Sequence, residues 1–205
     1  MKIAIFGATG RVGSIFMQHA LDEGYEVQAL IRKGRDVTPH ENLTIIRGDV
    51  TNIEDVNQTI DGCDAVFSGL NTDGTTTLSQ SIAHIIEVME NKMIDRIVTI
   101  GTAGIVESRV EPGKLRYLSS ESRQRVKFAA GEHEKVYRAL AESGLNWTII
   151  CPTALVSEPR VGVYRYEKDY LPLDGRRISI YDTADLAFEA LREHLFTHKR
   201  VGIAY

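Results

Sequence analysis

Cysteine is scarce in this chain of 205 residues, which contains only Cys63 and Cys151. Two isolated cysteines do not make a disulfide framework, and we expect both to be small buried apolar residues. No apolar run approaches the roughly 18 residues of a membrane span, and the opening residues MKIAIFG lack the cleavage site of a signal peptide. These absences argue against a membrane partner and predict a cytoplasmic protein.

The chain also lacks a large excess of charge of either sign. It has 24 basic and 28 acidic residues, for a net charge of −4. The scattered lysines and arginines argue against a nucleic acid as the main partner. No cluster of His, Cys, Asp and Glu has the spacing of metal ligands, and no Gly-x-Ser-x-Gly or Cys-His signature stands out. The composition, 43% apolar and 25% charged, is typical of one ordinary globular domain.

Short apolar runs alternate with helical patterns along the chain. The runs predict strands at residues 3–6, 27–31, 43–46, 65–68, 96–100, 146–151 and 201–204. Helical spacing predicts a helix that follows residue 10 and stops at Gly24, and others over 80–93 and from Ser119 or Ser120 to Ser143. A last helix is expected to have Asp182 as its cap and Asp185 in the capping-box position. This alternation predicts a single compact α/β domain with a doubly wound, mostly parallel Rossmann sheet and helices on both faces.

Glycine is concentrated where the first strand meets the first helix. Gly7, Gly10 and Gly13 give the spacing G-x-x-G-x-x-G. Glycines at such a junction allow a tight turn, a close approach of a pyrophosphate and close packing of helix on strand, and the N–H groups of the helix start bind the anion. Three glycines can also serve a purely structural turn. The strand before them and the amphipathic helix after them favour dinucleotide binding.

The residues after the second predicted strand indicate which dinucleotide is bound. Arg32 and Lys33 follow that strand, and the first acidic residue, Asp36, comes four positions after Arg32. An acid directly after the strand would accept a hydrogen bond from the ribose of NAD, whereas arginine pairs with the 2′-phosphate of NADP. The sequence therefore favours NADP, the alternative being an ordinary solvated loop. Arg11 adds a second phosphate contact or is a solvated residue at the helix start.

Several segments resemble one known family over essentially the full length of the chain. They are GATGRVG from Gly7, GDV from Gly48, SGLN from Ser68, GTAG from Gly101, SGLNWTIICPTAL from Ser143 and ISIYDTADLAFEAL from Ile178. Together they resemble the atypical short-chain dehydrogenase/reductases, and most of all their NmrA-like and NADPH-dependent flavin reductase/biliverdin reductase B branch. The resemblance implies a Rossmann fold and an NADP(H) cofactor.

The resemblance also implies roles for individual positions. The pyrophosphate positions are Thr9, Gly10, Arg11 and Val12, beside Gly7 and Gly13. Arg32 takes the 2′-phosphate and the adenine face, with Lys33 beside it, and Asp49 and Val50 touch the adenine. The nicotinamide positions are Gly69, Leu70, Pro152, Thr153 and Ala154, and Thr102 takes the position of the active-site hydroxyl.

One departure from the family pattern concerns the usual Tyr-x-x-x-Lys pair. Its two positions correspond to Ala129 and His133, and the literal match from Tyr164 to Lys168 follows the sixth predicted strand, so we interpret it as coincidence. The pair serves as general acid and base on an alcohol oxygen, and its absence argues against an ordinary alcohol dehydrogenase. A flavin, a quinone or a linear tetrapyrrole spreads the incoming negative charge and can take its proton from water.

Thr102 and His133 are the candidate catalytic residues. Thr102 follows a predicted strand, so its hydroxyl should lie at the carboxyl edge of the sheet, where ligands bind; a local turn hydrogen bond is the alternative. His133 falls in the apolar stripe of its helix and faces core or cleft. The stripe is formed by Val126, Ala129, Ala130, Val136, Tyr137 and Leu140. An ordinary pKa of about 6.5 suits acid–base work, and a core histidine bonded to a carbonyl is the other interpretation.

These observations predict an NADPH-dependent reductase that transfers a hydride to a small conjugated acceptor. The alternative is a catalytically inactive NADP-binding redox sensor of the NmrA-like kind. We expect one domain over residues 1–205, with a small substrate-side cap from about residue 152 to residue 180. Within the cap, the alternation from Val163 to Tyr166 predicts an exposed strand or flap. The acceptor's identity and the oligomeric state stay open.

Overall fold

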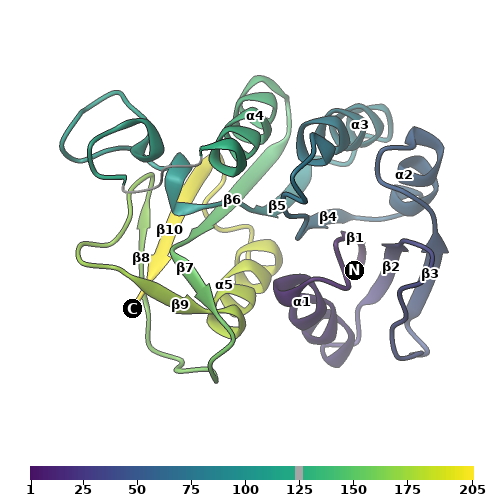
Figure 1. The fold of residues 1–205 in the computed structure, drawn as a ribbon. Helices are drawn as coiled ribbons and strands as arrows, with labels where there is room; N and C mark the ends of the chain where they lie inside the picture. Colours follow the sequence, from purple (N-terminus) through teal and green to yellow (C-terminus); the bar gives the residue numbers. More distant parts are fainter. Residues whose placement is uncertain (123–126) are drawn as a thin grey trace.

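Runs of buried aliphatic residues form one eight-stranded sheet in the computed structural model, which describes residues 1–122 and 127–205 (Figure 1). In spatial order its strands are β3 (Leu43–Arg47), β2 (Glu26–Ile31), β1 (Lys2–Phe6), β4 (Ala65–Ser68), β5 (Arg96–Ile100), β6 (Asn146–Pro152), β10 (Lys199–Ala204) and β8 (Arg165–Lys168). All neighbours pair in parallel except β8, which runs antiparallel to β10. The chain reverses its direction of winding between β1 and β4, which is where such sheets bind ligands.

Helices cover both faces of the sheet (Figure 1). One face carries α1 (Arg11–Asp22) and α5 (Ile180–Arg192), and the other carries α2 (Ile53–Ile60), α3 (Thr77–Asn91) and α4 (Phe128–Glu142). Alternate residues of β1 enter the two apolar cores, with Ile3 and Ile5 on the α1 side and Ala4 and Phe6 on the other. The predicted doubly wound fold is confirmed.

Shorter elements complete the chain beyond β5. Two 3₁₀ helices, Ala103–Ile105 and Arg116–Leu118, follow that strand. A small second sheet pairs β7 (Ala154–Val156) with β9 (Arg177–Ser179) in parallel. The predicted exposed strand near Tyr166 is confirmed as β8, although it begins at Arg165. Cys63 and Cys151 are buried, as expected. None of the described helices is long and apolar enough to cross a membrane.

The predicted helix that starts at Ser119 or Ser120 is wrong at its beginning. The described helix α4 starts at Phe128, and residues 119–121 form bends and turns. Ser119 explains the difference, because its Oγ donates to the carbonyl of Arg116 at 2.9 Å and accepts from the amide of Glu121 at 3.3 Å. Such local bonds compete with helix formation. Val126, which we assigned to the apolar stripe, lies outside the described residues.

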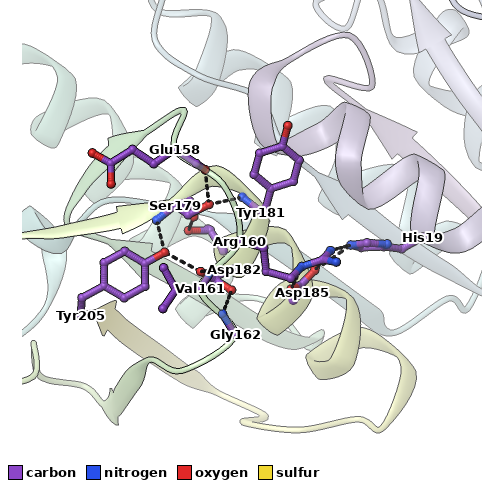
Figure 2. A network of polar contacts seen from close by, with 11 residues as sticks. His19, Glu158, Arg160, Val161, Gly162, Ser179, Tyr181, Asp182, Asp185 and Tyr205 are labelled. Atoms are coloured by element: carbon purple, nitrogen blue, oxygen red, sulfur yellow. Dashed lines mark hydrogen bonds and ion pairs between the residues drawn. The ribbon is translucent and has the colours of Figure 1, made fainter.

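The predicted cap of the last helix is also wrong, because Ser179 caps α5 through its Oγ, which accepts from the amide of Tyr181 at 3.0 Å. Asp182 is fully buried and instead accepts from the amides of Val161 and Gly162 at 3.0 and 2.9 Å and from the Tyr205 hydroxyl (Figure 2).

Asp185, expected in a capping box, has distant partners rather than a capping role. It lies 2.8 Å from the Nε2 of His19 on α1 and forms an ion pair with Arg160 at 2.7 Å (Figure 2). Its carboxylate therefore connects the segment before β8 to α1 and α5. Partners far away in the sequence decided the roles of both acids.

Candidate active-site cleft

Three adjoining cavities form a cleft along the carboxyl ends of the parallel strands. The first cavity, about 270 Å³, lies beyond β1 and β2; the central cavity, about 460 Å³, lies beyond β4, β5 and β6; and the third cavity, about 820 Å³, lies beyond β6 beside the segment that precedes β9. The first and central cavities share Gly10, Gly69 and Leu70. The central and third cavities share Thr102 and the turn at 152–153. The cleft is therefore continuous from β2 to the cap segment.

The glycine turn forms the inner wall of the cleft and requires glycine for steric reasons. Gly7 has a φ of +79°, and a Cβ there would lie 2.7 Å from the carbonyl carbon of Gly69. A Cβ on Gly13 would lie 2.1 Å from the carbonyl oxygen of Gly7. The amide of Gly10 closes the turn by donating to that same oxygen at 2.9 Å. Close packing of strand, turn and helix thus leaves no room for side chains at these positions.

The start of α1 fits a pyrophosphate. Gly10 is its N-cap, no described side chain caps it, and its first turn contains no acidic residue. Arg11 and Val12 line the central cavity together with Gly10. Uncapped N–H groups and the positive end of the helix dipole attract an anion at this point. The cradle that glycine creates and the charge of this helix start both suit a dinucleotide.

The first cavity contains some, but not all, of the basic residues that follow β2. Among the described residues its lining includes Arg32 and Arg35, and it does not include Lys33, which is exposed. Arg35 is one of the basic residues that the sequence places where a cofactor phosphate would sit. Gly34, with a φ of +79°, lets the loop turn back toward the cavity. Arg47 on β3 holds this turn through a hydrogen bond to the carbonyl of Arg35.

Asp49 and Val50 line the first cavity. The Asp49 carboxylate accepts from the amide and the hydroxyl of Thr51 at 2.9 and 2.7 Å, and these bonds, with a smaller contribution from Arg32, lower its pKa. The carboxylate is therefore ionised near neutral pH, and Thr51 fixes its position.

The central cavity gathers the candidate catalytic residues. Thr102 lies two residues after the end of β5, and Ala129 and His133 reach the cavity from α4. Both positions that correspond to the Tyr-x-x-x-Lys pair therefore face the cleft. The Thr102 hydroxyl also accepts from the amide of Gly104 at 3.4 Å, so the local bond exists alongside the cleft position. Ala154 lines the third cavity rather than the central one.

His133 is buried and borders the cleft at the same time. It is 6% exposed, and burial lowers its pKa from 6.5 to about 4. The neighbouring Glu132 opposes this shift only weakly, and its own carboxylate binds Lys135 at 2.6 Å and the amide of Ser79 at 3.3 Å. His133 is therefore neutral near neutral pH, where its ring offers one N–H donor and one acceptor.

The low pKa of His133 predicts a loss of stability in mild acid. The unfolded chain binds a proton at pH values below about 6.5, whereas the folded chain resists it until about pH 4. The free energy of unfolding should therefore fall by about 2 kcal/mol from about pH 7 to about pH 5 because of this residue alone. Urea unfolding of the wild type and of His133→Gln, which cannot titrate, measures the difference. Identical pH dependence in both proteins would contradict the buried, neutral state.

The sheet order, the glycine turn and the cleft define the dinucleotide-binding class of Rossmann folds. A family model described as NAD(P)H-binding matches residues 7–194, and the chain belongs to this family.

Individual relatives are distant in sequence and close in fold. The uncharacterised protein YwnB of Bacillus subtilis is 24% identical over 198 residues, which cover 94% of this chain and 92% of YwnB. A short-chain dehydrogenase/reductase of Veillonella parvula, solved in complex with NADP, has a TM-score of 0.81 at 21% identity, with 100% of this chain and 94% of that chain covered. A proposed NADH-flavin reductase of Streptococcus pneumoniae has a TM-score of 0.82 at 22% identity, with 100% and 99% covered. The two structures support the fold.

Proposed function

We propose that the protein is an NADPH-dependent oxidoreductase that reduces a small conjugated acceptor such as a flavin or a quinone, in the cytoplasm. The observation that carries this proposal is the lining of the central cavity. It contains the glycine turn and Thr102, and the described lining residues include neither tyrosine nor lysine at the acid–base positions. Such a site suits an acceptor that needs alignment more than protonation.

In this proposal each part of the cleft has one task. Bound NADPH supplies the hydride. The start of α1 holds the pyrophosphate, the first cavity holds the adenosine end, and the turn of Pro152 and Thr153 backs the nicotinamide end. Thr102 and the neutral ring of His133 offer hydrogen bonds to a polar atom of the acceptor. The third cavity admits the acceptor beneath the cap of residues 152–180.

The apolar part of the central cavity's lining supports the binding of a flat acceptor for hydride transfer. Leu70, Ile100, Ala129 and Leu155 contribute apolar surface to the central cavity. Flat aromatic ligands bind to surfaces of this kind with a few polar groups to fix their orientation. The sequence resemblance to the NmrA-like and flavin reductase branch supports the same proposal, and the similarity to the Streptococcus pneumoniae protein, a proposed NADH-flavin reductase, supports a flavin as acceptor.

Arg32→Ala should weaken NADPH binding about 10- to 100-fold, because charge-assisted hydrogen bonds to a phosphate contribute about 1.5–3 kcal/mol. The Kd of NADH should change little, since NADH has no 2′-phosphate. Lys33→Ala is the matched control, because Lys33 is the adjacent cation and does not line the described cavity. Calorimetric titration with both cofactors provides the measurement. Equal losses for NADPH and NADH would show that Arg32 does not discriminate between them.

Steady-state oxidation of NADPH tests the proposed activity. The reduced-nicotinamide absorbance should fall when FMN or a quinone is added with the protein, and more slowly when NADH replaces NADPH. Tight binding of NADP⁺ with no oxidation of NADPH by any acceptor would contradict the proposal. That result would favour the redox sensor, which does not need the Tyr-Lys pair.

A further inference from the structure

Two arginines are buried within the described sheet, and only one of them binds a residue that lines the cleft. Arg200 on β10 is 4% exposed. Its Nη1 donates to the carbonyl of Ile105 and its Nη2 to the carboxylate of Glu107, both at 2.6 Å. Its Nε lies 3.8 Å from the carboxylate of Asp169 and has no hydrogen-bond partner among the described residues. A buried guanidinium of this kind holds its partners firmly, because an unpaired charge would be costly.

The partners of Arg200 belong to separate walls of the cleft. Ile105 and Glu107 continue the segment that starts at Thr102, and Glu107 lines the third cavity. Asp169 precedes the segment 171–176, which also lines that cavity. The amide of Glu107 donates to the carbonyl of Asp169 at 2.8 Å, so the two walls also bond to each other beside the guanidinium.

Helix α4, which also lines the cleft, packs on the face of the Arg200 guanidinium through Tyr137. The guanidinium carbon of Arg200 lies 4.2 Å from the centre of the Tyr137 ring. Tyr137 is one helical turn after His133 on α4, the helix that brings Ala129 and His133 to the central cavity. A cation stacked on an aromatic ring fixes the distance between the two elements that carry them.

Asp169 adopts a left-handed backbone conformation at the start of this turn. Its φ is +62°, which is unfavourable for a residue with a side chain. Its carboxylate accepts from Lys199 at 2.7 Å and from the amide of Arg200 at 3.3 Å. Two cations thus neutralise Asp169 and Glu107 at this point, and the turn that begins the wall of residues 171–176 is stabilised from β10.

We propose that Arg200 is a positioning residue for the acceptor: it sets the spacing of the Thr102 segment, the 171–176 segment and helix α4 around the acceptor end of the cleft. The inference rests on the proposed reductase function. The cofactor's adenosine end is independent of this anchor, because the described residues that line the first cavity all fall between Phe6 and Thr77. Lysine cannot replace Arg200, since only the planar guanidinium can donate in two directions and stack at once.

Arg200→Lys is the test, and Arg96→Lys is the matched control. Among the described residues, Arg96 is the other buried arginine with an unbonded Nε. It lies at the start of β5 and is bonded to the carbonyls of Asn146, Ala190 and Leu195. With FMN as acceptor, Arg200→Lys should lower kcat/KM about 10- to 100-fold, largely through KM, because small displacements of a substrate wall have effects of this size. The Kd of NADP⁺ should stay within about threefold of the wild-type value, and Arg96→Lys should leave both quantities at wild-type levels.

Amide hydrogen exchange separates this proposal from the proposed activity. In Arg200→Lys, residues 103–107 and 169–176 should exchange faster while residues 6–13 keep wild-type protection, and Arg96→Lys should not show this pattern. This readout holds even if no acceptor is reduced. Glu107→Gln provides a second variant that keeps Arg200, and it should accelerate exchange in the same two segments. Equal loss of NADP⁺ affinity and FMN turnover in Arg200→Lys, or unchanged exchange in both segments, would overturn the positioning role.

Discussion

Gly13→Ala should weaken NADP⁺ binding at least about 100-fold. The added Cβ would lie 2.1 Å from the carbonyl oxygen of Gly7, and that contact can be relieved only by moving the turn or the start of α1. The same oxygen accepts the bond from Gly10 that closes the turn. A shift of either element moves the N–H groups that we assign to the pyrophosphate. A strain of about 1–3 kcal/mol corresponds to roughly 5- to 150-fold in affinity, and the loss of the displaced contacts adds to it.

Gly131→Ala is the control for this prediction. Gly131 lies inside α4, and a Cβ there meets no atom within 4 Å. Alanine in place of a helical glycine stabilises a protein by about 0.5–1 kcal/mol. The control should therefore raise the melting temperature and leave the calorimetric Kd of NADP⁺ unchanged. If Gly13→Ala bound NADP⁺ as tightly as Gly131→Ala, the glycine turn would not be the anion site.

Arg96→Met should lower the free energy of unfolding by about 3 kcal/mol. The guanidinium donates to the carbonyls of Asn146, Ala190 and Leu195 and to the hydroxyl of Thr148. Methionine fills the space but leaves buried carbonyls without a donor, at about 1–3 kcal/mol each, partly offset because a buried charge is also removed. Burial already opposes that charge, since it lowers the pKa of Arg96 to about 10.

Chemical denaturation measures this loss through the midpoint of the urea transition. Arg96→Lys retains a charge that can reach some of the same carbonyls, so its loss should be smaller than that of Arg96→Met. Arg32→Ala, at an exposed position, should change the midpoint little. A loss below about 1 kcal/mol in Arg96→Met would mean that the end of α5 does not depend on this side chain.

The sheet could be predicted from the sequence because helices cover both faces of its strands. Each strand from β1 to β6 is then a short apolar run, such as Ile97 to Ile100, that needs no partner to be recognised. Helix α2 was missed, because its eight residues bury only Val56, Thr59 and Ile60 and give too short a pattern. The errors at Ser119 and Asp182 have other causes. Ser119 makes local bonds to Arg116 and Glu121 that compete with a helix start. Asp182 is bound by Val161, Gly162 and Tyr205, which are distant in the sequence, and so does not act as a cap.

Some parts of the candidate site could be predicted because they depend on local sequence, and other parts could not because they depend on long-range contacts. The glycine turn depends on conformations that adjacent residues dictate, and Thr102 and His133 follow from a strand end and a helical period. The third cavity could not be predicted, because ion pairs such as Arg109 with Glu167 and Arg200 with Glu107 hold its walls across long stretches of chain. No periodicity in the sequence reports such contacts.

The most direct measurement of the central claim is the fate of a deuterium label on NADPH. The protein would be mixed with FMN and with NADPH that carries deuterium at one or the other of the two C4 positions. If the central cavity holds the nicotinamide with one face against the turn at 152–153 and the other toward the acceptor, only one of the two labels is lost and only that one slows FMN reduction. Loss of both labels alike, or NADP⁺ binding with no FMN reduction, would contradict hydride transfer in this cleft.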